Sequence, residues 1–160
     1  MSKRVSMLVP AVLFVVSSAL PGIADDRPNI LFILFDDLGY GDLGSYGHPY
    51  VRTPNLDALA GRGTVFTRFY AAAPVCSPTR ASVLTGRHPK RMGIDNPNTG
   101  ELPHEEITIA EIARDLGYVT AHFGKWHLGT MTYDVKDSNR GAPGNEEEYS
   151  PPWEHGYDVV

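Results

Sequence analysis

The 160-residue chain contains a single cysteine, so no disulfide can form within it. It is also poor in basic residues, with 14 lysines and arginines against 19 aspartates and glutamates and a formal net charge of −5. This balance leaves no basic patch to hold a nucleic-acid backbone, and no block of like charges marks a tail. No internal repeat is present. The composition therefore excludes a disulfide framework, a repeat array and a nucleic-acid partner.

No apolar run is long enough for a stable membrane span. The N-terminal run, residues 5–16, is shorter than the roughly 20 residues that a span requires, and Pro10 interrupts it. Lys3 and Arg4 precede the run, and small residues follow it up to Ala24. These are the three parts of a secretory signal peptide, and we favour this interpretation over an uncleaved anchor. We expect export, either to a periplasm or out of the cell.

Cleavage would leave residues 25–160 as the mature chain. Removing Lys3 and Arg4 leaves 12 basic residues against 19 acidic ones, a net charge of −7. About 136 residues suffice for one domain with a core. In an exported chain an unpaired cysteine is either a reactive group or a small buried hydrophobe, and its neighbours must decide which.

Strand-like and helix-like segments alternate along the mature chain. Residues 30–35 form an unbroken apolar run, typical of a strand buried on both faces of a parallel sheet. Further strands are predicted at 65–70, at 118–123 and from 156 onward. Helices are predicted at 54–60 with Thr53 as N-cap and Gly61 as the stop, at 77–85 ending at Gly86, and at 109–116 behind a capping box at Thr108 and Glu111. We expect an α/β fold with a mainly parallel sheet flanked by helices.

Two segments stand outside this alternation. Residues 131–153 are polar and rich in glycine, proline and glutamate, which predicts a surface excursion. Residues 39–44 fit the pattern G-x-G-x-x-G, but neighbouring aspartates would repel a pyrophosphate and no helix can start after Gly44. We therefore set a nucleotide site aside. Because the sequence stops where a strand begins, we expect an incomplete domain.

Asp36 and Asp37 follow the first predicted strand directly. Adjacent carboxylates raise each other's pKa unless a cation lies between them, although a solvated loop would also accept two aspartates. Ligand crevices in open α/β sheets lie at the carboxyl ends of strands. The position therefore favours a hard divalent metal.

Cys76 is predicted to lie at the first turn of a helix, with Arg80 near the same face one turn later. The free N–H groups of the helix start and a nearby guanidinium make an environment for a reactive thiol. Farther along, Lys125 and His127 are two residues apart in a segment predicted to be extended. Their side chains would therefore point to one side while Trp126 packs behind them.

The residues Cys76-Ser77-Pro78-Thr79-Arg80 resemble the C-x-P-x-R signature of the formylglycine-dependent sulfatases, a family with the alkaline-phosphatase-like α/β fold. The hexapeptide 124–129 is similar to the second signature of that family, and Asp36-Asp37 is similar to its metal-binding start. Gly156-Tyr157-Asp158 resembles its next strand entrance. The likeness covers residues 28–158 in the family's order.

The resemblance implies a sulfuric ester hydrolase that acts on an aryl or carbohydrate sulfate ester. A formylglycine-generating enzyme would convert Cys76 to an aldehyde during export, and one hydroxyl of the hydrated aldehyde would attack sulfur. Collapse of the other hydroxyl to the aldehyde would then expel inorganic sulfate. Calcium would be held by Asp36, Asp37 and the modified Cys76.

The same resemblance implies a role for each remaining site residue. Arg80 would fix the hydrated aldehyde and its negative charge. Lys125 would bind a sulfate oxygen or the diol, and His127 would hydrogen-bond the hydroxyl that loses its proton in the collapse.

The sequence lacks segments that the family usually has. These are further metal ligands, a lysine and a histidine near the leaving group, and a C-terminal domain. We therefore expect the 160 residues alone to be weakly active or inactive. Two alternatives stay open: a phosphonate or phosphodiester hydrolase of the same superfamily, and a non-catalytic exported domain in which Cys76 stays a buried thiol.

Overall fold

The computed structural model describes residues 27–137, 140–141 and 146–160. The predicted signal peptide, residues 1–24, lies outside the described residues. The chain divides into two compact units, Met1–Phe35 and Asp36–Val160. In the described part, no helix has the length and apolar character that crossing a membrane requires.

The described end of the first unit, residues 27–35, has no regular secondary structure. The apolar run 30–35 is exposed, with Leu31 at 85% and Phe32 at 64% of full accessibility. The prediction that this run is buried is therefore wrong for this structure. A buried strand needs hydrogen-bonded neighbours on both sides, and the described part of this unit contains no second strand.

In the second unit, a short 3₁₀ helix η1, Gly44–Tyr46, precedes helix α1, Pro54–Arg62. The sequence predicts α1, but two details differ. Gly61 lies inside the helix, and the N–H of Gly63 closes its last turn on the Leu59 carbonyl at 2.9 Å. Thr53 does not cap the helix with its side chain, because its hydroxyl accepts from the Gly44 N–H and donates to Asp57, both at 2.8 Å.

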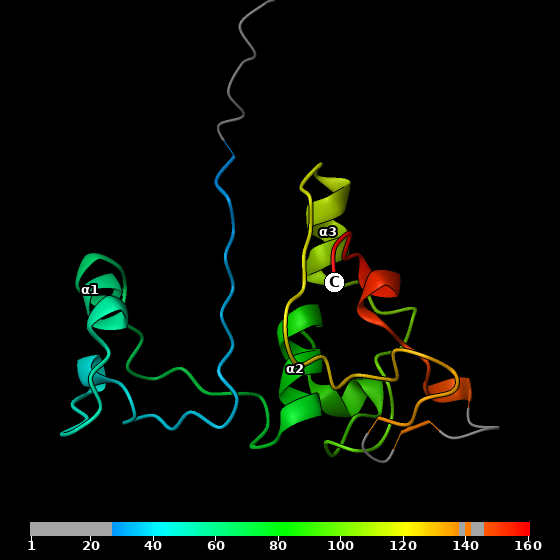
Figure 1. Cartoon of the computed structure of the whole chain (residues 1–160), viewed down its shortest axis with the longest axis horizontal. Helices are drawn as coiled ribbons and strands as arrows, with labels where there is room; N and C mark the ends of the chain where they lie inside the picture. Colours follow the sequence, from blue (N-terminus) through cyan, green and yellow to red (C-terminus); the bar gives the residue numbers. More distant parts are fainter. Residues whose placement is uncertain (1–26, 138–139, 142–145) are drawn as a thin grey trace, which may run out of the picture. The chain divides into compact units, whose positions relative to one another are not determined.

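Helix α2, Cys76–Thr85, begins at the cysteine and ends, as predicted, at Gly86 in the left-handed conformation (Figure 1). The 3₁₀ helix η2, Pro89–Met92, follows and contacts α2. Its first turn is capped by the His88 side chain. Local stop and start signals in the sequence therefore fix this part of the fold.

Helix α3, Ile109–Asp115, starts with the predicted capping box. The Thr108 hydroxyl accepts from the Glu111 N–H at 3.1 Å, and the Glu111 carboxylate accepts from the Thr108 N–H at 2.7 Å. The same hydroxyl donates to the His155 carbonyl at 2.7 Å. This bond joins α3 to the 3₁₀ helix η4, Pro152–His155, which runs beside it (Figure 1).

The predicted sheet is represented by single bridges in the described residues. Ala121 pairs with Val159 in parallel, supported by a bond from the His122 N–H to the Val159 carbonyl at 2.9 Å. Thr130 pairs in parallel with Tyr149, next to the 3₁₀ helix η3, Glu146–Glu148. The predicted strand at 65–70 is exposed and contains a turn. The parallel sheet therefore stays a prediction, because strands form only where partners are present to accept their hydrogen bonds.

The hydrophobic core lies between α2, η2 and the segment around residue 127. Its buried members are Ala81, Met92, Ile94, Leu102, Trp126 and Leu128. The Leu102 N–H donates to the Leu128 carbonyl at 2.7 Å, which ties the two fully buried leucines together. This core supports the residues on either side of Trp126.

Within the predicted surface excursion 131–153, the prediction is wrong for four fully buried residues, Arg140, Ser150, Pro151 and Pro152. The Ser150 hydroxyl donates to the Leu102 carbonyl at 2.8 Å and lies 2.6 Å from Nε2 of the buried His155. Because a hydroxyl has one hydrogen, this arrangement requires the imidazole to donate its Nε2–H to Ser150. Burial and, to a smaller extent, the neighbouring His104 lower the pKa of His155 to about 4.

The His155 site predicts acid sensitivity. Between pH 6.5 and about 4 the unfolded chain binds a proton at this histidine and the folded chain does not. The contribution of His155 to the free energy of unfolding is therefore complete above pH 6.5 and falls as the pH drops, by up to about 3 kcal/mol. Urea unfolding at several pH values should show a shallower decline for His155→Gln than for wild type. Equal slopes in His155→Gln and wild type would contradict the assignment.

Candidate active site

The site is built around the start of α2. Cys76 is the first residue of this helix and is partly exposed, and no side chain caps the helix ahead of it. Arg80 lies one turn later on the same helix, and its side chain is only 11% exposed. The guanidinium therefore has a fixed direction, back toward the start of the helix.

Asp36 forms ion pairs with two cations. Its carboxylate lies 3.0 Å from Nη2 of Arg80 and 2.9 Å from Nζ of Lys125. The hydrogen bond from Lys125, followed by that from Arg80, lowers the pKa of the Asp36 carboxyl. Asp36 is therefore held as a carboxylate against two positive charges.

Lys125 links the acidic residue to the cysteine. Its Nζ lies 3.3 Å from Sγ of Cys76 in addition to its bond with Asp36. The hydrogen bond to Asp36 raises the pKa of Lys125 against the opposing effect of burial, and Cys76 raises it further. The Lys125 carbonyl accepts a hydrogen bond from Nη1 of Arg80 at 2.6 Å, so the four residues form a closed network.

Asp37 and Asp36 offer oxygens close to the cysteine. One ligand atom from each of Asp36, Asp37 and Cys76 lies within 4.8 Å of the other two. The backbone of Asp37 is left-handed, with φ of 58°. This conformation is unusual for a residue with a Cβ, and it coincides here with a predicted ligand position.

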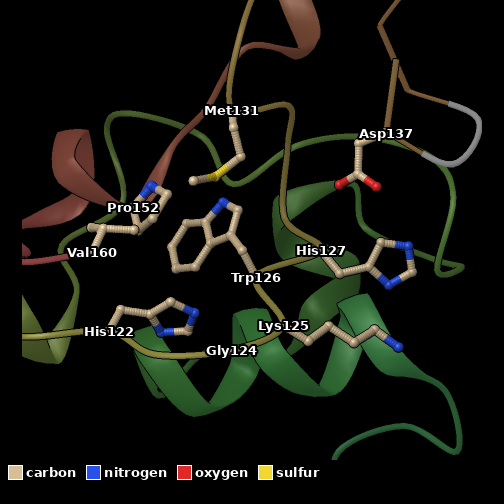
Figure 2. A pocket seen from close by; sticks show the side chains of 9 residues that line it. All are labelled: His122, Gly124, Lys125, Trp126, His127, Met131, Asp137, Pro152 and Val160. Atoms are coloured by element: carbon tan, nitrogen blue, oxygen red, sulfur yellow. The ribbon is translucent and has the colours of Figure 1, made fainter. Parts of the chain in front are cut away.

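His127 lies two residues beyond Lys125, and both side chains extend to the same side while Trp126 packs toward the core, as the sequence predicts (Figure 2). Its ring nitrogens are buried and have no hydrogen-bond partner among the described residues. Burial lowers the pKa of the imidazole, and the charges of Arg140 and Lys125 lower it further. The ring is therefore held neutral, with both nitrogens free for a ligand.

A cavity of about 360 Å³ adjoins these residues (Figure 2). It is lined by His122, Gly124, Lys125, Trp126, His127, Met131, Asp137, Pro152 and Val160. Lys125 therefore lines this cavity and also contacts Asp36 and Cys76.

The structure thus gathers Asp36, Asp37, Cys76, Arg80 and Lys125 around one point. His127 joins them through its backbone, since its carbonyl lies 2.5 Å from the hydroxyl of Ser77, next to Cys76. Sequence reasoning missed the roles of Ser77 and of Arg140, which donates to Ser77 at 3.0 Å. Ser77 could have been found inside the motif around Cys76, whereas no local pattern marks Arg140.

Paired carboxylates, two cations and a partly exposed cysteine together are typical of a metal-assisted hydrolase. The model of the family described as Sulfatase matches residues 28–158. The chain belongs to the sulfatase family.

Known proteins show the same relationship. Human "Arylsulfatase A" is 54% identical over 114 residues, which are 68% of this chain and 22% of the relative. A solved structure from work on glycosaminoglycan metabolism by Bacteroides thetaiotaomicron has a TM-score of 0.66 at 36% identity, covering 85% of this chain and 28% of the other. The phosphonate monoester hydrolase of Agrobacterium radiobacter has a TM-score of 0.61 at 32% identity, covering 83% and 25%. The chain spans about a fifth of the length of the curated relatives it matches.

The Lys125 contact predicts an altered reactivity of Cys76. The ammonium lies 3.3 Å from Sγ, where its positive charge attracts the negative charge of the reacting sulfur. In unconverted protein, Lys125→Met should slow alkylation of Cys76 by iodoacetamide about two- to fivefold, as expected for a partly exposed charge pair. The matched change Lys90→Met removes an exposed lysine of η2 and should leave the rate unchanged. Equal rates for Lys125→Met and wild type would show that the contact has no effect on the thiolate.

Proposed function

We propose that this protein hydrolyses sulfate esters and releases inorganic sulfate, with residue 76 as the source of the nucleophile. The observation that carries the proposal is the position of Lys125 Nζ, 3.3 Å from Sγ of Cys76 and 2.9 Å from Asp36. It brings a nucleophile position, an anion-binding cation and a predicted metal ligand together in a chain of the sulfatase family.

The nucleophile would come from conversion of Cys76 to formylglycine by a sulfatase-modifying enzyme. In the structure, the sulfur of Cys76 stands where the hydrated aldehyde of the modified residue would carry its oxygens. This aldehyde hydrate would supply the attacking hydroxyl. The partial exposure of Cys76 is compatible with a substrate approaching it.

Two cations would bind the charged groups of the reaction. Arg80 is held in a fixed orientation by its bonds to Asp36 and to the Lys125 carbonyl. Lys125 reaches the sulfur position directly and would offset negative charge that develops on the sulfate oxygens. Neither cation needs to reorganise during the reaction, since the network already orients both.

His127 would accept or hold the proton of the hydroxyl that collapses. A neutral imidazole is needed for this step, and burial lowers the pKa of His127 in that direction. Its two nitrogens have no competing partner among the described residues.

The residues present fit a divalent cation, which we propose is calcium. Two carboxylates and the residue at position 76 place their ligand atoms within 4.8 Å of one another. A hard cation prefers oxygen ligands, so the modified residue 76 would suit it better than a thiol. When bound, the cation would polarise the sulfate oxygens.

We propose that residues 25–160 form the amino-terminal part of an α/β catalytic domain with a mainly parallel sheet. The parallel pairing of Ala121 with Val159 supports this arrangement. The N-terminal charge and hydropathy pattern supports removal of residues 1–24 and export to a periplasm or out of the cell.

Aryl and carbohydrate sulfate esters are the proposed substrates. Human arylsulfatase A and a protein from glycosaminoglycan metabolism are both similar to this chain. A phosphonate monoester hydrolase is also similar, and this observation keeps phosphonate or phosphodiester hydrolysis as the alternative.

The proposed calcium site predicts that Asp37 contributes to calcium binding and that Asp42, in the same loop, does not. Asp37 belongs to the ligand cluster, whereas Asp42 bonds the Gly39 N–H at 2.6 Å and lies outside the cluster. In isothermal titration calorimetry, Asp37→Asn should weaken calcium binding at least about tenfold through loss of one anionic ligand. Asp42→Asn should bind as wild type. Equal weakening by both changes would assign the effect to overall charge and refute the site.

The proposed function is tested by the mass of the peptide containing Cys76 and by the product released from an ester. The chain is produced with a sulfatase-modifying enzyme, and the peptide containing Cys76 is weighed. Conversion exchanges sulfur for oxygen and removes two hydrogens, whereas a remaining thiol reacts with iodoacetamide. Matched 4-nitrophenyl sulfate and phosphate esters, with calcium present, then distinguish the two reactions.

We expect conversion of Cys76 and slow release of sulfate in preference to phosphate, abolished in Cys76→Ala. The rate should be low because the further metal ligands and leaving-group acid of the family are not found in this sequence. A persistent thiol would favour a non-catalytic exported domain, and preferential phosphate release would favour the phosphonate or phosphodiester alternative. Sulfate release undiminished in Cys76→Ala would refute the role of residue 76.

A further inference from the structure

The hydroxyl of Ser77 is a buried hydrogen-bonding group next to the site. Ser77 is fully buried, and its Oγ lies 2.5 Å from the His127 carbonyl and 2.7 Å from the Pro97 carbonyl. A hydroxyl has one hydrogen to donate and two lone pairs to accept with. The serine next to the nucleophile position is therefore bonded to the backbone of the segment that carries His127.

Arg140 occupies the accepting side of that hydroxyl. Its side chain is fully buried, its Nη2 donates to Ser77 Oγ at 3.0 Å, and its Nε donates to the Gly100 carbonyl at 2.6 Å. Because the guanidinium can only donate, it directs the serine hydrogen away from itself and toward the carbonyls. A charged donor also strengthens the hydrogen bond that the serine gives in turn.

Of the two carbonyls that share this hydrogen, that of His127 is nearer than that of Pro97, and it belongs to a residue in an unfavourable conformation. His127 is left-handed, with φ of 59°, although it is not glycine. Such a residue costs of order 1 kcal/mol or more and persists only where its surroundings determine it. The next residue is fixed as well, since the Leu128 carbonyl accepts from the Leu102 N–H at 2.7 Å.

We propose that Arg140 and Ser77 are positioning residues, and that the relay from Arg140 to Ser77 to the His127 carbonyl holds the His127 turn against the start of α2. The catalytic consequence of this inference rests on the proposed function, because the relay sets the distance between residue 76 and the His127 imidazole. Its structural consequence, the left-handed backbone at His127, is independent of activity.

A general packing role would not explain this arrangement. Packing alone needs an apolar side chain at 140, whereas burial of a guanidinium is unfavourable unless its donors are used. Arg140 donates through Nε to Gly100 and through Nη2 to Ser77, on segments that flank the site, while its buried Nη1 has no hydrogen-bond partner among the described residues. The relay spans 63 residues between Ser77 and Arg140 and 50 between Ser77 and His127, so it joins parts of the fold that no local signal connects.

The test compares Ser77→Ala and Arg140→Met with Ser150→Ala in the full chain. Ser150 is also a fully buried serine with two partners, the Leu102 carbonyl and His155, and it lies outside the relay. Urea unfolding establishes how much each change destabilises the chain. NMR then measures the one-bond Cα–Hα coupling and the backbone carbon shifts of residue 127, which distinguish a left-handed from an extended backbone.

We expect Ser77→Ala to move residue 127 out of the left-handed region and Arg140→Met to populate both conformations. Ser150→Ala should leave residue 127 unchanged at a similar loss of stability. Because Arg140 acts through Ser77, adding Arg140→Met to Ser77→Ala should not change the residue 127 signals further. A left-handed residue 127 in Ser77→Ala, or an additional shift in the double variant, would overturn the relay.

In converted enzyme, kcat should fall at least about tenfold in Ser77→Ala with little change in KM, since only alignment is lost. If Cys76 is not converted in wild type, the proposed function fails while the NMR comparison still decides the relay. If Arg140→Met does not fold, the comparison of Ser77→Ala with Ser150→Ala tests the relay by itself. A wild-type kcat in Ser77→Ala would refute the catalytic consequence.

Discussion

The carboxylate of Asp36 accepts hydrogen bonds from two cations that come from distant parts of the sequence, Arg80 in α2 and Lys125 in the segment before Trp126. Either pair alone, partly open to water, would contribute little to stability. The network closes because Arg80 also donates to the Lys125 carbonyl and Lys125 also reaches Cys76. The positions of Arg80 and Lys125 beside residue 76 therefore depend on one shared carboxylate.

This network also sets the local charge. In the free site, the charges of Asp36 and Asp37 cancel those of Arg80 and Lys125, so two cations inside an acidic protein create no net positive potential by themselves. An added divalent cation would change the sign and leave the site attractive to an anionic ester. Asp36 thus holds two cations in place beside residue 76.

Short-range sequence signals predicted the helices, whereas contacts between residues distant in the sequence determine strand formation and the burial of polar residues. The start of α2 at Cys76 and the capping box at Thr108 depend on hydrogen bonds within a few residues, which spacing reveals. The run 30–35 has the composition of a strand, but a strand requires a partner that the sequence of the run does not specify. Arg140 lies in a polar segment and contacts Ser77 across 63 residues, so periodicity gave no indication that it is buried.

In the described part, glycine and non-glycine residues with positive φ differ in backbone strain. Several glycines adopt positive φ, among them Gly124 and Gly129 on either side of the second motif, and they do so without a side chain to strain. The two non-glycine residues with positive φ are Asp37 and His127. Glycine at these positions would relieve the backbone but would remove a carboxylate and an imidazole. Both residues are ones that the sequence predicts for the site, and strained non-glycine residues cluster at functional sites.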